Sequence, residues 1–377
     1  MEQRVPRRPR WTVPVTLAFA FAAALLLLAP AAGAAKRQVP VGFFGSNWDN
    51  EIALTSSQEM RVSNWKLMAD TGVEAARTTF LWSRAQPRAI DPVNFVDTDA
   101  QVKLAAANHI QLLPVVASAP RWARESDAPN SPPKNRGAYA NYIRQLIERY
   151  GTEGSFWDEH PRLTKRAIRA FQIANEPSAN YQWTIPEGED WAPGYGALLR
   201  KSYKVIKAAD PGTKVVLAGL PNQSYQDLEH LYKVGDIHGS FDVAALHPYT
   251  HHDHGVLTIA QRFHAVMNKY GDGSKQLWIT ELGLPASKGR SSDPSPLQTT
   301  DRGMADFLTQ SYTDLMKNRQ KLHVPKVYWY TWASNYKGWI FNYTGLRRYR
   351  HRGGGEEVTD RMALKAYRKL ARHAQGR

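Results

Sequence analysis

A regular alternation of strand-like and helix-like segments is the feature that most restricts the fold of this 377-residue chain. Eight apolar, strand-like segments are expected at 41–45, 73–79, 110–117, 170–175, 214–218, 241–247, 276–281 and 326–332. Each precedes an amphipathic segment typical of a helix, at 57–70, 98–108, 137–150, 195–209, 224–234, 256–270, 301–319 and 360–373. Strands that alternate with helices form parallel sheets, and eight such units close into a barrel. The sequence therefore predicts an α/β fold, a (β/α)8 TIM barrel.

The structural alternative is a doubly wound open sheet, which also alternates strands and helices. Such folds commonly carry a glycine-rich phosphate turn after the first strand, and this chain has none there. Glycines at 72, 151, 235 and 271 fall where four of the helices are expected to end. Since glycine accepts a left-handed backbone, we expect each of them to terminate its helix in that conformation.

The first 35 residues form a region of their own. Four arginines within the first ten residues precede an apolar run at 11–28, and Ala32-Gly33-Ala34 offers a small-residue cleavage site. This pattern is typical of a secretory signal peptide at 1–35, and an uncleaved membrane anchor is the alternative. Residues 36–377 are then expected to form one catalytic domain. We expect a secreted, extracellular protein, either released or associated with the cell envelope.

Composition limits the partners of the chain. It has no cysteine, so a secreted protein of this size depends on its core and has no disulfide framework. The formal charge is +15, but the basic residues are scattered, apart from runs at 347–352 and in the last ten positions. Such runs are usually solvated faces, although an anionic glycan or cell-wall polymer stays open as a partner. We expect a monomer that binds no nucleic acid and, once the signal is removed, no membrane.

Two of the predicted strands run directly into a glutamate. Asn175-Glu176-Pro177 ends the fourth strand, and Glu281 ends the seventh. In a (β/α)8 barrel the chemistry gathers at the carboxyl ends of the strands, so both side chains are expected in one cleft. A pair of carboxylic groups on rigid supports is what retaining glycoside hydrolysis requires.

Other strand ends are polar or aromatic as well. The second strand ends near Arg77, the sixth in His247-Pro248-Tyr249 and the eighth in Trp332. One such residue alone is usually structural, but five strand ends whose side chains suit a single mechanism favour a functional cluster.

With these motifs the chain resembles the glycoside hydrolases of clan A, which are (β/α)8 enzymes with one glutamate after strand four and another after strand seven. The resemblance implies that Glu176 is the acid/base and Glu281 the nucleophile. It also implies substrate-site roles for four further residues. Arg77 and Tyr249 would hold the nucleophile, His247 would line the site and Trp332 would form the floor of the sugar subsite. Asn175, next to Glu176, is expected to bind the sugar 2-hydroxyl.

The segment 119–123 follows the third strand and contains Trp122. It is more similar to family 39 and its relatives than to the cellulases of family 5, which often carry a histidine there. Trp122 is therefore also expected to contact the substrate.

The expected environment assigns the chemical roles. A carboxylate beside a guanidinium and a phenol hydroxyl is favoured as the anion, which a nucleophile requires, so Glu281 is the predicted nucleophile. Glu176 faces a second carboxylate and is predicted to hold the proton of the general acid. This mechanism requires carboxyl groups about 5–5.5 Å apart and predicts a product that keeps its anomeric configuration.

Aromatic residues follow the fourth and eighth strands in two groups. They are Tyr181, Trp183, Trp191, Tyr195, Tyr336, Trp339, Phe341 and Tyr343. We expect half of them to offer rings to a sugar and half to pack loops onto the barrel, with Trp183 among the former. Asn335 and Lys337 are candidates for binding hydroxyl groups.

No cofactor or metal is predicted. The segment His251-His252-Asp253-His254 has poor spacing for a metal site and is interpreted as a solvated loop. No Gly-x-Ser-x-Gly turn indicates an esterase. The sequence thus predicts a glycoside hydrolase acting on O-glycosyl bonds, with a carbohydrate as its substrate and with a β linkage implied by the resemblance. A transglycosylase and a catalytically silent carbohydrate-binding barrel are the alternatives.

Overall fold

A computed structural model describes residues 1–3, 36–222, 224–252, 254–353 and 355–377. The predicted signal at 1–35 lies outside these residues, apart from the first three. Within the described part of the chain, no helix is long and apolar enough to cross a membrane.

The strands form one closed, parallel barrel. They are β1 (Phe44–Asn47), β2 (Ala75–Leu81), β3 (Gln111–Ala117), β4 (Ala170–Ile173), β5 (Lys214–Val216), β6 (Leu220–Pro221), β7 (Val243–His247), β8 (Gln276–Leu282) and β9 (Val327–Trp329). β1 pairs with both β2 and β9, and β5 pairs with β7, which closes the ring. Because β5 and β6 both pair with β7, they act as two pieces of one stave. The barrel therefore has eight staves, which confirms the predicted fold and excludes the open sheet.

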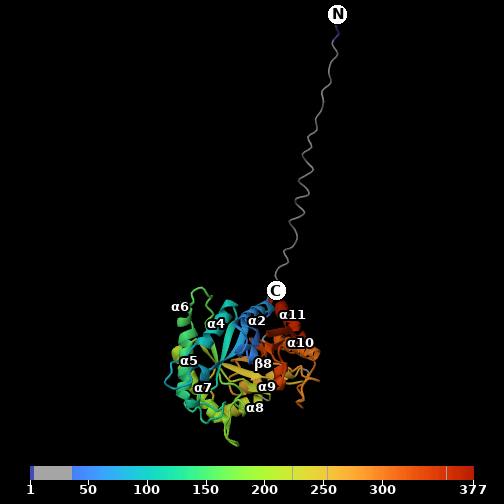
Figure 1. The fold of residues 1–377 in the computed structure, drawn as a ribbon. Helices are drawn as coiled ribbons and strands as arrows, with labels where there is room; N and C mark the ends of the chain where they lie inside the picture. Colours follow the sequence, from blue (N-terminus) through green and yellow to red (C-terminus); the bar gives the residue numbers. More distant parts are fainter. Residues whose placement is uncertain (4–35, 223, 253, 354) are drawn as a thin grey trace.

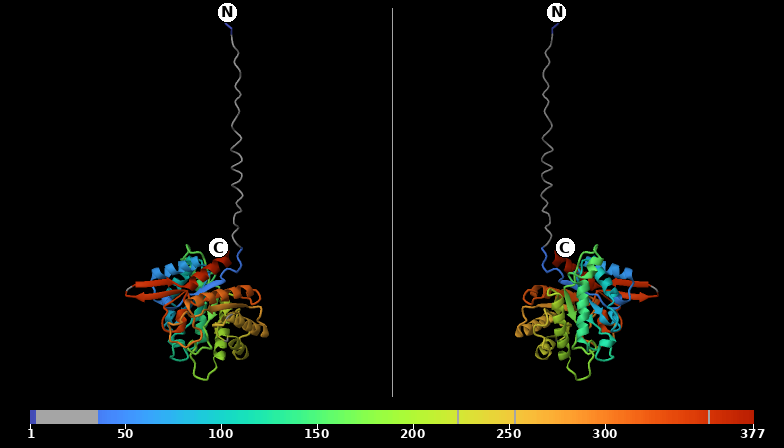
Figure 2. Two further views of the ribbon diagram at one scale, coloured as in Figure 1. Left: turned by 90° about the vertical axis from the view of Figure 1, so that its right-hand side faces the viewer. Right: turned by 90° about the vertical axis from the view of Figure 1, so that its left-hand side faces the viewer.

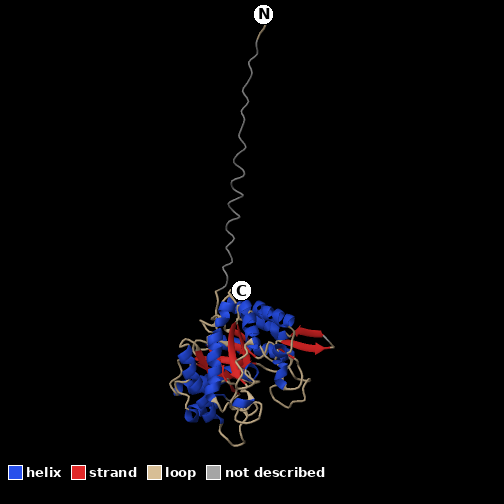
Figure 3. Cartoon of the chain, turned by 60° about the vertical axis from the view of Figure 1, so that its left-hand side comes forward, coloured by secondary structure: helices blue, strands red, loops and turns tan. Residues whose placement is uncertain are grey.

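Helices surround the barrel, as Figures 1 and 3 show. The eight main ones are α2 (Gln58–Thr71), α4 (Val96–Ala107), α5 (Arg136–Tyr150), α7 (Trp191–Ala209), α8 (Ser224–His230), α9 (Gly255–Lys269), α10 (Asp301–Asn318) and α11 (Met362–Gln375). Shorter elements are α1 (Asn50–Leu54), α3 (Trp82–Ala85), α6 (Ser155–Glu159), 3₁₀ turns at Arg121–Ala123 and Ile340–Tyr343, and a π-helical turn at Leu231–Gly235 that follows α8. Every predicted helix is present, with ends shifted by a few residues.

The glycines at the helix ends behave in two ways. Gly72 (φ 103°) and Gly271 (φ 81°) have the expected left-handed backbone. The expectation is wrong for Gly151, whose φ is −66°, and for Gly235, because Asp236 takes the left-handed position with φ 50°. Gly235 lies in close packing instead, since a Cβ on it would lie 3.2 Å from the Ala192 carbonyl oxygen, and a Cβ on Gly196 would lie only 1.8 Å from the Gly235 carbonyl oxygen. The absence of side chains at Gly196 and Gly235 therefore lets α7 pack directly against the turn that follows α8.

Two apolar clusters build the core. The larger one fills the space between barrel and helices, and it includes Trp65 and Phe263. The smaller one lies inside the barrel and combines small side chains such as those of Ala75 and Val216 with the rings of Trp278 and Tyr328. Burial of this apolar surface is the main stabilising contribution to such a fold. The barrel is therefore a filled scaffold that holds its strand ends rigidly.

A second, small sheet was not predicted. It consists of β10 (Ala333–Ser334), β11 (Arg347–Arg352) and β12 (Gly355–Asp360), and the hairpin of β11 and β12 projects from the body of the molecule (Figure 2). The basic run was expected to be a solvated face, but Arg347 pairs with Asp360 at 2.7 Å and Tyr349 is fully buried. On β12, Asp360 pairs with Arg347 and Glu357 with Arg350, which neutralises part of the charge on β11.

Candidate active site

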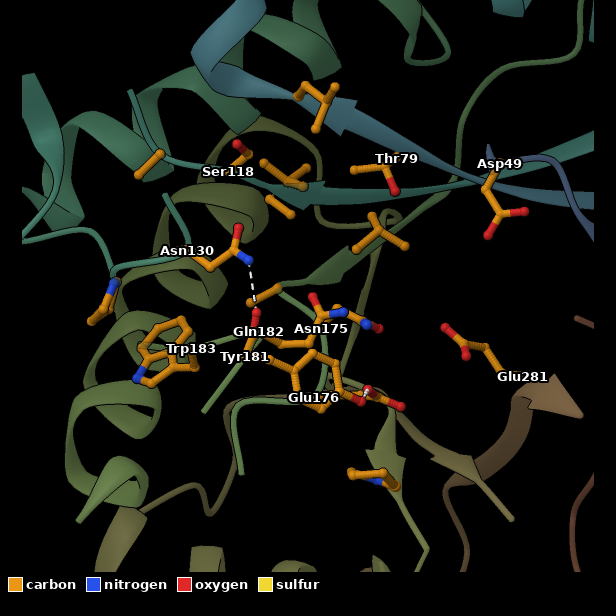
Figure 4. Close-up of a pocket in the computed structure, with 18 of the residues that line it drawn as sticks. Asp49, Thr79, Ser118, Asn130, Asn175, Glu176, Tyr181, Gln182, Trp183 and Glu281 are labelled. Carbon is orange, nitrogen blue, oxygen red and sulfur yellow. Dashed lines mark hydrogen bonds between the residues drawn. The ribbon is translucent and has the colours of Figure 1, made fainter. Parts of the chain in front are cut away.

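A cavity of about 300 Å³ opens at the carboxyl ends of the barrel strands. Glu176, just after β4, and Glu281, in β8, both line it, as Figure 4 shows. Both residues are largely buried, with 4% and 7% of their surface exposed. The structure thus brings together the two glutamates that the sequence singled out, although 105 residues separate them in the chain.

The backbone that carries Glu176 is strained. Ala174 (φ 59°) and Glu176 (φ 40°) have left-handed conformations, which residues with a side chain rarely adopt. The amide N–H of Glu176 donates to the carbonyl oxygen of Gly219 at 3.1 Å, and Gln172 donates to that of Ala174 at 3.0 Å. Such strain persists only where the surroundings hold it, and it is concentrated at functional sites.

Both oxygens of Glu281 accept hydrogen bonds from predicted partners. Arg77 Nη1 donates to Oε1 at 2.7 Å, and the Tyr249 hydroxyl donates to Oε2 at 2.6 Å. Burial raises the pKa of Glu281. The nearby charges of His247 and Arg77 and the hydrogen bond from Tyr249 lower it by more than burial raises it, so the pKa of Glu281 lies below its ordinary value. Burial, with the Glu281 charge next, raises the pKa of Tyr249 well above its ordinary value, so this phenol stays protonated and donates. The arrangement favours Glu281 as the anion.

Arg77 is itself held by a set of amides. Its Nε donates to Gln172 Oε1 at 2.9 Å, its Nη1 also donates to Asn47 Oδ1 at 2.7 Å, and its Nη2 donates to Asn175 Oδ1 at 2.6 Å. Sequence reasoning missed Asn47 and Gln172. The available signal for Gln172 was a single amide in an otherwise apolar strand, whereas Asn47 lay beyond the predicted end of the first strand.

Glu176 has partners that suit a proton carrier. The Tyr181 hydroxyl donates to Oε2 at 2.9 Å, and Oε1 lies 2.7 Å from Nδ1 of the fully buried His247. Nε2 of His247 lies 3.0 Å from the Thr280 hydroxyl. Nδ1 of His247 also lies 3.6 Å from Glu281 Oε2, so this imidazole bridges the two carboxyl groups.

One atom each from Glu176, His247 and Glu281 lie within 4.8 Å of one another. Three such ligand atoms can in general hold a metal ion, and this is the one set of its kind found in the described part of the chain. The donors do not fit a divalent cation well, because Arg77 already places a positive charge on Glu281 and Tyr249 occupies its other oxygen. That the reaction needs no metal stays a prediction.

The histidine segment after β7 lies on the surface. His251, His252 and His254 are exposed, and His254 Nδ1 lies 2.7 Å from Asp314 Oδ2. Asp253 is outside the described residues.

Two predicted substrate contacts are wrong. Trp332 is fully buried, and its Nε1 donates to Asn64 Oδ1 on α2 at 2.9 Å, so it packs behind the barrel and Tyr330 lines the cavity instead. Trp122 also lies outside the cavity lining. Its ring packs edge-on against Trp82 at 5.3 Å, and its Nε1 donates to the Gln86 carbonyl oxygen.

The eight cleft aromatics divide evenly, as expected. Those that line the cavity are Tyr181, Trp183, Trp339 and Phe341, whereas Trp191, Tyr195, Tyr336 and Tyr343 pack elsewhere. Trp183 is only 4% exposed, but Trp339 is 49% exposed and lies 4.8 Å from the Phe341 ring. Asn335 and Lys337 do not line the cavity. Tyr181, at 56% exposed, and Trp339 are therefore the most accessible rings of this set.

Asp49 is a third acidic residue at the cavity, and sequence reasoning missed it. Burial raises its pKa to about 6, while a hydrogen bond from Thr331 opposes this rise and the charge of Glu281 adds to it. Asp49 follows β1, which extends to Asn47, whereas the predicted strand stopped at residue 45. With the correct strand end, Asp49 would have been recognised at the functional rim.

A second cavity, of about 260 Å³, adjoins the first. Both are lined by Thr79 and Leu81 at the end of β2. The cleft therefore continues beyond the two glutamates toward α4.

Comparison with known proteins supports this site. A family model described as the glycosyl hydrolase catalytic core matches residues 163–346, the part of the chain that contains both glutamates. No curated protein sequence matches the chain.

Solved structures share the fold at low sequence identity. A family 39 glycoside hydrolase from the gut symbiont Bacteroides cellulosilyticus has a TM-score of 0.63 at 16% identity, over 90% of this chain and 64% of its own. A family 39 enzyme from Xanthomonas axonopodis pv. citri has a TM-score of 0.63 at 17% identity, and the match covers 89% of this chain and 67% of that enzyme. A monomeric β-xylosidase from Caulobacter crescentus has a TM-score of 0.61 at 16% identity, and the match covers 89% of this chain and 69% of that enzyme. This chain thus spans less than two thirds of the length of the Bacteroides enzyme.

The family match covers the strand ends that carry the glutamates, and the neighbours share the eight-stave barrel beneath them. Residues 163–346 therefore match glycosyl hydrolase catalytic cores, and the (β/α)8 barrel that carries both glutamates resembles those of clan A glycosidases.

Proposed function

We propose that this protein is a secreted, retaining glycoside hydrolase that cleaves β-linked sugars by a double displacement on Glu281 and Glu176. The observation that carries the proposal is the short separation of the two carboxyl groups, one oxygen of each lying within 4.8 Å of the other. Retaining enzymes hold their carboxyl groups about 5–5.5 Å apart, whereas inverting enzymes need about 6.5–9.5 Å to admit a water molecule. The spacing supports the retaining route.

Glu281 acts as the nucleophile in the first step. Its oxygen attacks the anomeric carbon while the bond to the leaving oxygen breaks, which forms a covalent glycosyl-enzyme. Arg77 and Tyr249 keep the carboxylate ionised and fix its orientation. Because both donors come from other staves of the barrel, the nucleophile is positioned before the substrate binds.

Glu176 acts as the acid and then as the base. It gives its proton to the leaving oxygen, so the first product departs as an alcohol. It then takes a proton from the water that hydrolyses the glycosyl-enzyme. The contacts with Tyr181 and His247 hold the carboxyl group in place through both steps. Nδ1 of His247 also lies 3.6 Å from Glu281 Oε2, so the imidazole stays close to both carboxyl groups as their charges change during the two steps.

The remaining residues of the cleft suit a carbohydrate. Asn175 Oδ1 accepts from Arg77, which leaves the Nδ2 group as the donor for a sugar hydroxyl. The rings of Tyr181 and Trp339 offer apolar faces to the C–H face of a sugar. The Caulobacter neighbour is described as a monomeric β-xylosidase, which supports proposing a β linkage and a monomer. Secretion is proposed from the sequence of residues 1–35 alone.

The experiment is a screen against chromogenic β-glycosides and polysaccharides, followed by NMR of the first-formed product of the best substrate. The proposal requires that this product has the anomeric configuration of the substrate, and an inverted product would refute it.

Two variants then test the roles. Glu281→Gln should abolish hydrolysis. Glu176→Gln should reduce kcat about 10²–10⁴-fold on substrates with poor leaving groups, because the departing oxygen is no longer protonated. On a substrate whose leaving group departs without acid assistance, such as a dinitrophenyl glycoside, added azide should restore turnover by attacking the glycosyl-enzyme and yielding the glycosyl azide. The exposed Glu153→Gln is the matched control and should keep full activity.

A further inference from the structure

A third cavity, of about 410 Å³, lies at the opposite end of the barrel from the two glutamates. Its lining includes the first residues of β3, β4 and β5, which are Gln111, Ala170 and Lys214, and Lys326, which directly precedes β9. The amino ends of barrel strands usually serve stability, and no step of the proposed mechanism uses this cavity. Its volume falls within the range of small-ligand sites.

Four cationic side chains line this cavity, and its lining contains no carboxylate. They are Arg166, Arg169, Lys214 and Lys326. Within the described ranges, none of the four forms an ion pair. The Nζ of Lys326 donates to Gln111 at 2.6 Å, and that of Lys214 donates to Gln276 at 2.9 Å. These acceptors are uncharged amides, so the positive charge of the cavity is not neutralised.

Asp210, Glu74 and Asp242 act on these cations from outside the cavity lining, and all three are engaged by other groups. Asp210, near Arg169, accepts from the Gly212 amide and from the Thr213 hydroxyl, both at 2.8 Å. Glu74 accepts from Arg37 and from the Gly42 amide at 2.8 Å. Asp242 accepts from Lys207 Nζ at 2.8 Å and from the Val215 amide at 2.7 Å. None of the three carboxylates can turn toward the cavity without breaking these contacts.

One buried donor in the cavity wall is unpaired. Within the described part of the chain, Nε of Arg166 has no hydrogen-bond partner. A buried donor without an acceptor is costly, and each such group requires an explanation. Burial, together with the charge of Lys214, lowers the pKa of Lys326 to about 8. Both observations indicate cations that an anion would stabilise.

Two glycines keep the cations accessible. A Cβ on Gly42 would lie 2.5 Å from Lys326 Nζ, and a Cβ on Gly212 would lie 2.6 Å from Arg169 Nη2. The floor is formed by Trp278 and Tyr328, both at least nine-tenths buried. The cavity therefore has charged walls and an aromatic floor.

We propose that this cavity is a binding site for an oxyanion, either inorganic phosphate or the carboxylate of an acidic sugar, held by Arg166, Arg169, Lys214 and Lys326. Two guanidinium groups can each offer parallel N–H donors to such an anion, and the lysines add point charges. A site of this kind would hold an anionic ligand at the end of the barrel away from the active cleft.

Isothermal titration calorimetry on the folded protein tests the proposal, with inorganic phosphate in one arm and sodium glucuronate in the other. Potassium chloride keeps the ionic strength constant, because general screening by salt must not be mistaken for binding. The test variant is the pair Arg166→Gln and Arg169→Gln. The matched control is the pair Arg162→Gln and Lys165→Gln, which removes the same charge from exposed positions in the same segment.

We expect saturable binding of one anion, weakened about tenfold or more in the test variant and unchanged in the control. Tighter binding of phosphate would identify a phosphate or phosphate ester as the ligand, and tighter binding of glucuronate would identify a sugar acid. Absence of saturable binding in both arms, or equal weakening in the control, would overturn the proposal. Thermal denaturation of each variant verifies that the fold is intact.

Discussion

Replacing Tyr249 by phenylalanine should move the acidic limb of the pH profile to higher pH. The Tyr249 hydroxyl donates to Glu281 Oε2 at 2.6 Å in a buried environment, and this bond is one of the contacts that lower the pKa of Glu281. Phenylalanine keeps the ring, which packs edge-on against Phe341 at 4.6 Å, and removes only the donor. The anion of Glu281 is then less stabilised while its neutral form is nearly unaffected.

The size of the shift follows from the strength of the lost bond. A hydrogen bond to a charged group contributes about 1.5–3 kcal/mol, and 1.36 kcal/mol corresponds to one pH unit, so the pKa of Glu281 should rise by about 1–2 units. Arg77 still holds Oε1 at 2.7 Å, which keeps the shift near the lower value. Since a nucleophile must be ionised, activity is lost at a higher pH than in the unchanged protein.

The assay is kcat/KM against pH on a chromogenic β-glycoside, because its acidic limb reports the ionisation of groups in the free enzyme. Tyr367→Phe is the matched control, since this buried hydroxyl donates to the Gly45 carbonyl oxygen at 3.0 Å, outside the cavity. If the acidic limb of Tyr249→Phe stays in place or moves to lower pH, the assignment of Glu281 as the nucleophile is refuted.

Three further changes test the site. Gly219→Ala would place a Cβ 1.9 Å from His247 Nε2 and should reduce kcat about 10²-fold by displacing the imidazole, whereas Gly194→Ala, with open space around its Cβ, should keep kcat unchanged. Asp49→Asn should raise the melting temperature more at pH 7.5 than at pH 4.5. The pKa of this carboxyl is raised from 3.8 to about 6, so its ionisation costs up to about 3 kcal/mol of stability as pH rises through that range. Trp339→Ala should raise KM about tenfold for oligosaccharides and less for monosaccharide glycosides, through loss of apolar contact.

Each of these three has its own contrary result. Unchanged kinetics in Gly219→Ala would mean that the imidazole does not position Glu176. An equal gain in melting temperature at both pH values would remove the ionisation of Asp49 as the cause. An equal rise in KM for short and long substrates of Trp339→Ala would indicate a structural role for the ring.

The barrel and its two glutamates could be predicted because both depend on local patterns. The alternation of strands and helices determines the fold class, and a glutamate at a strand end must lie at the functional rim once the fold is known. Strand ends marked Arg77 and Tyr249 as residues of the rim, and the resemblance to clan A implied that both hold the nucleophile. The structure places both against Glu281.

Residues just beyond the strand ends were harder to predict, because the regular alternation of side chains stops where the strand stops. Trp332 was expected in the cleft, but β9 ends at Trp329, and Tyr330 faces the cavity while Trp332 packs against α2. The error for Asp49 has the same origin, since β1 ends two residues later than expected. Side chains alternate regularly only within a strand, so beyond its end Tyr330 and Trp332 point in different directions although they lie two residues apart.

The position of His247 shows why a site of this kind requires a whole barrel. Its ring fits only because Gly219, near the end of another stave, has no side chain, and its two nitrogens contact Glu176 after β4 and Thr280 in β8. No local sequence pattern links these positions, since the contacts form only when the ring of strands is closed. The imidazole therefore ties the two carboxyl-bearing staves together, and the separation between their carboxyl groups is set by the closed barrel itself.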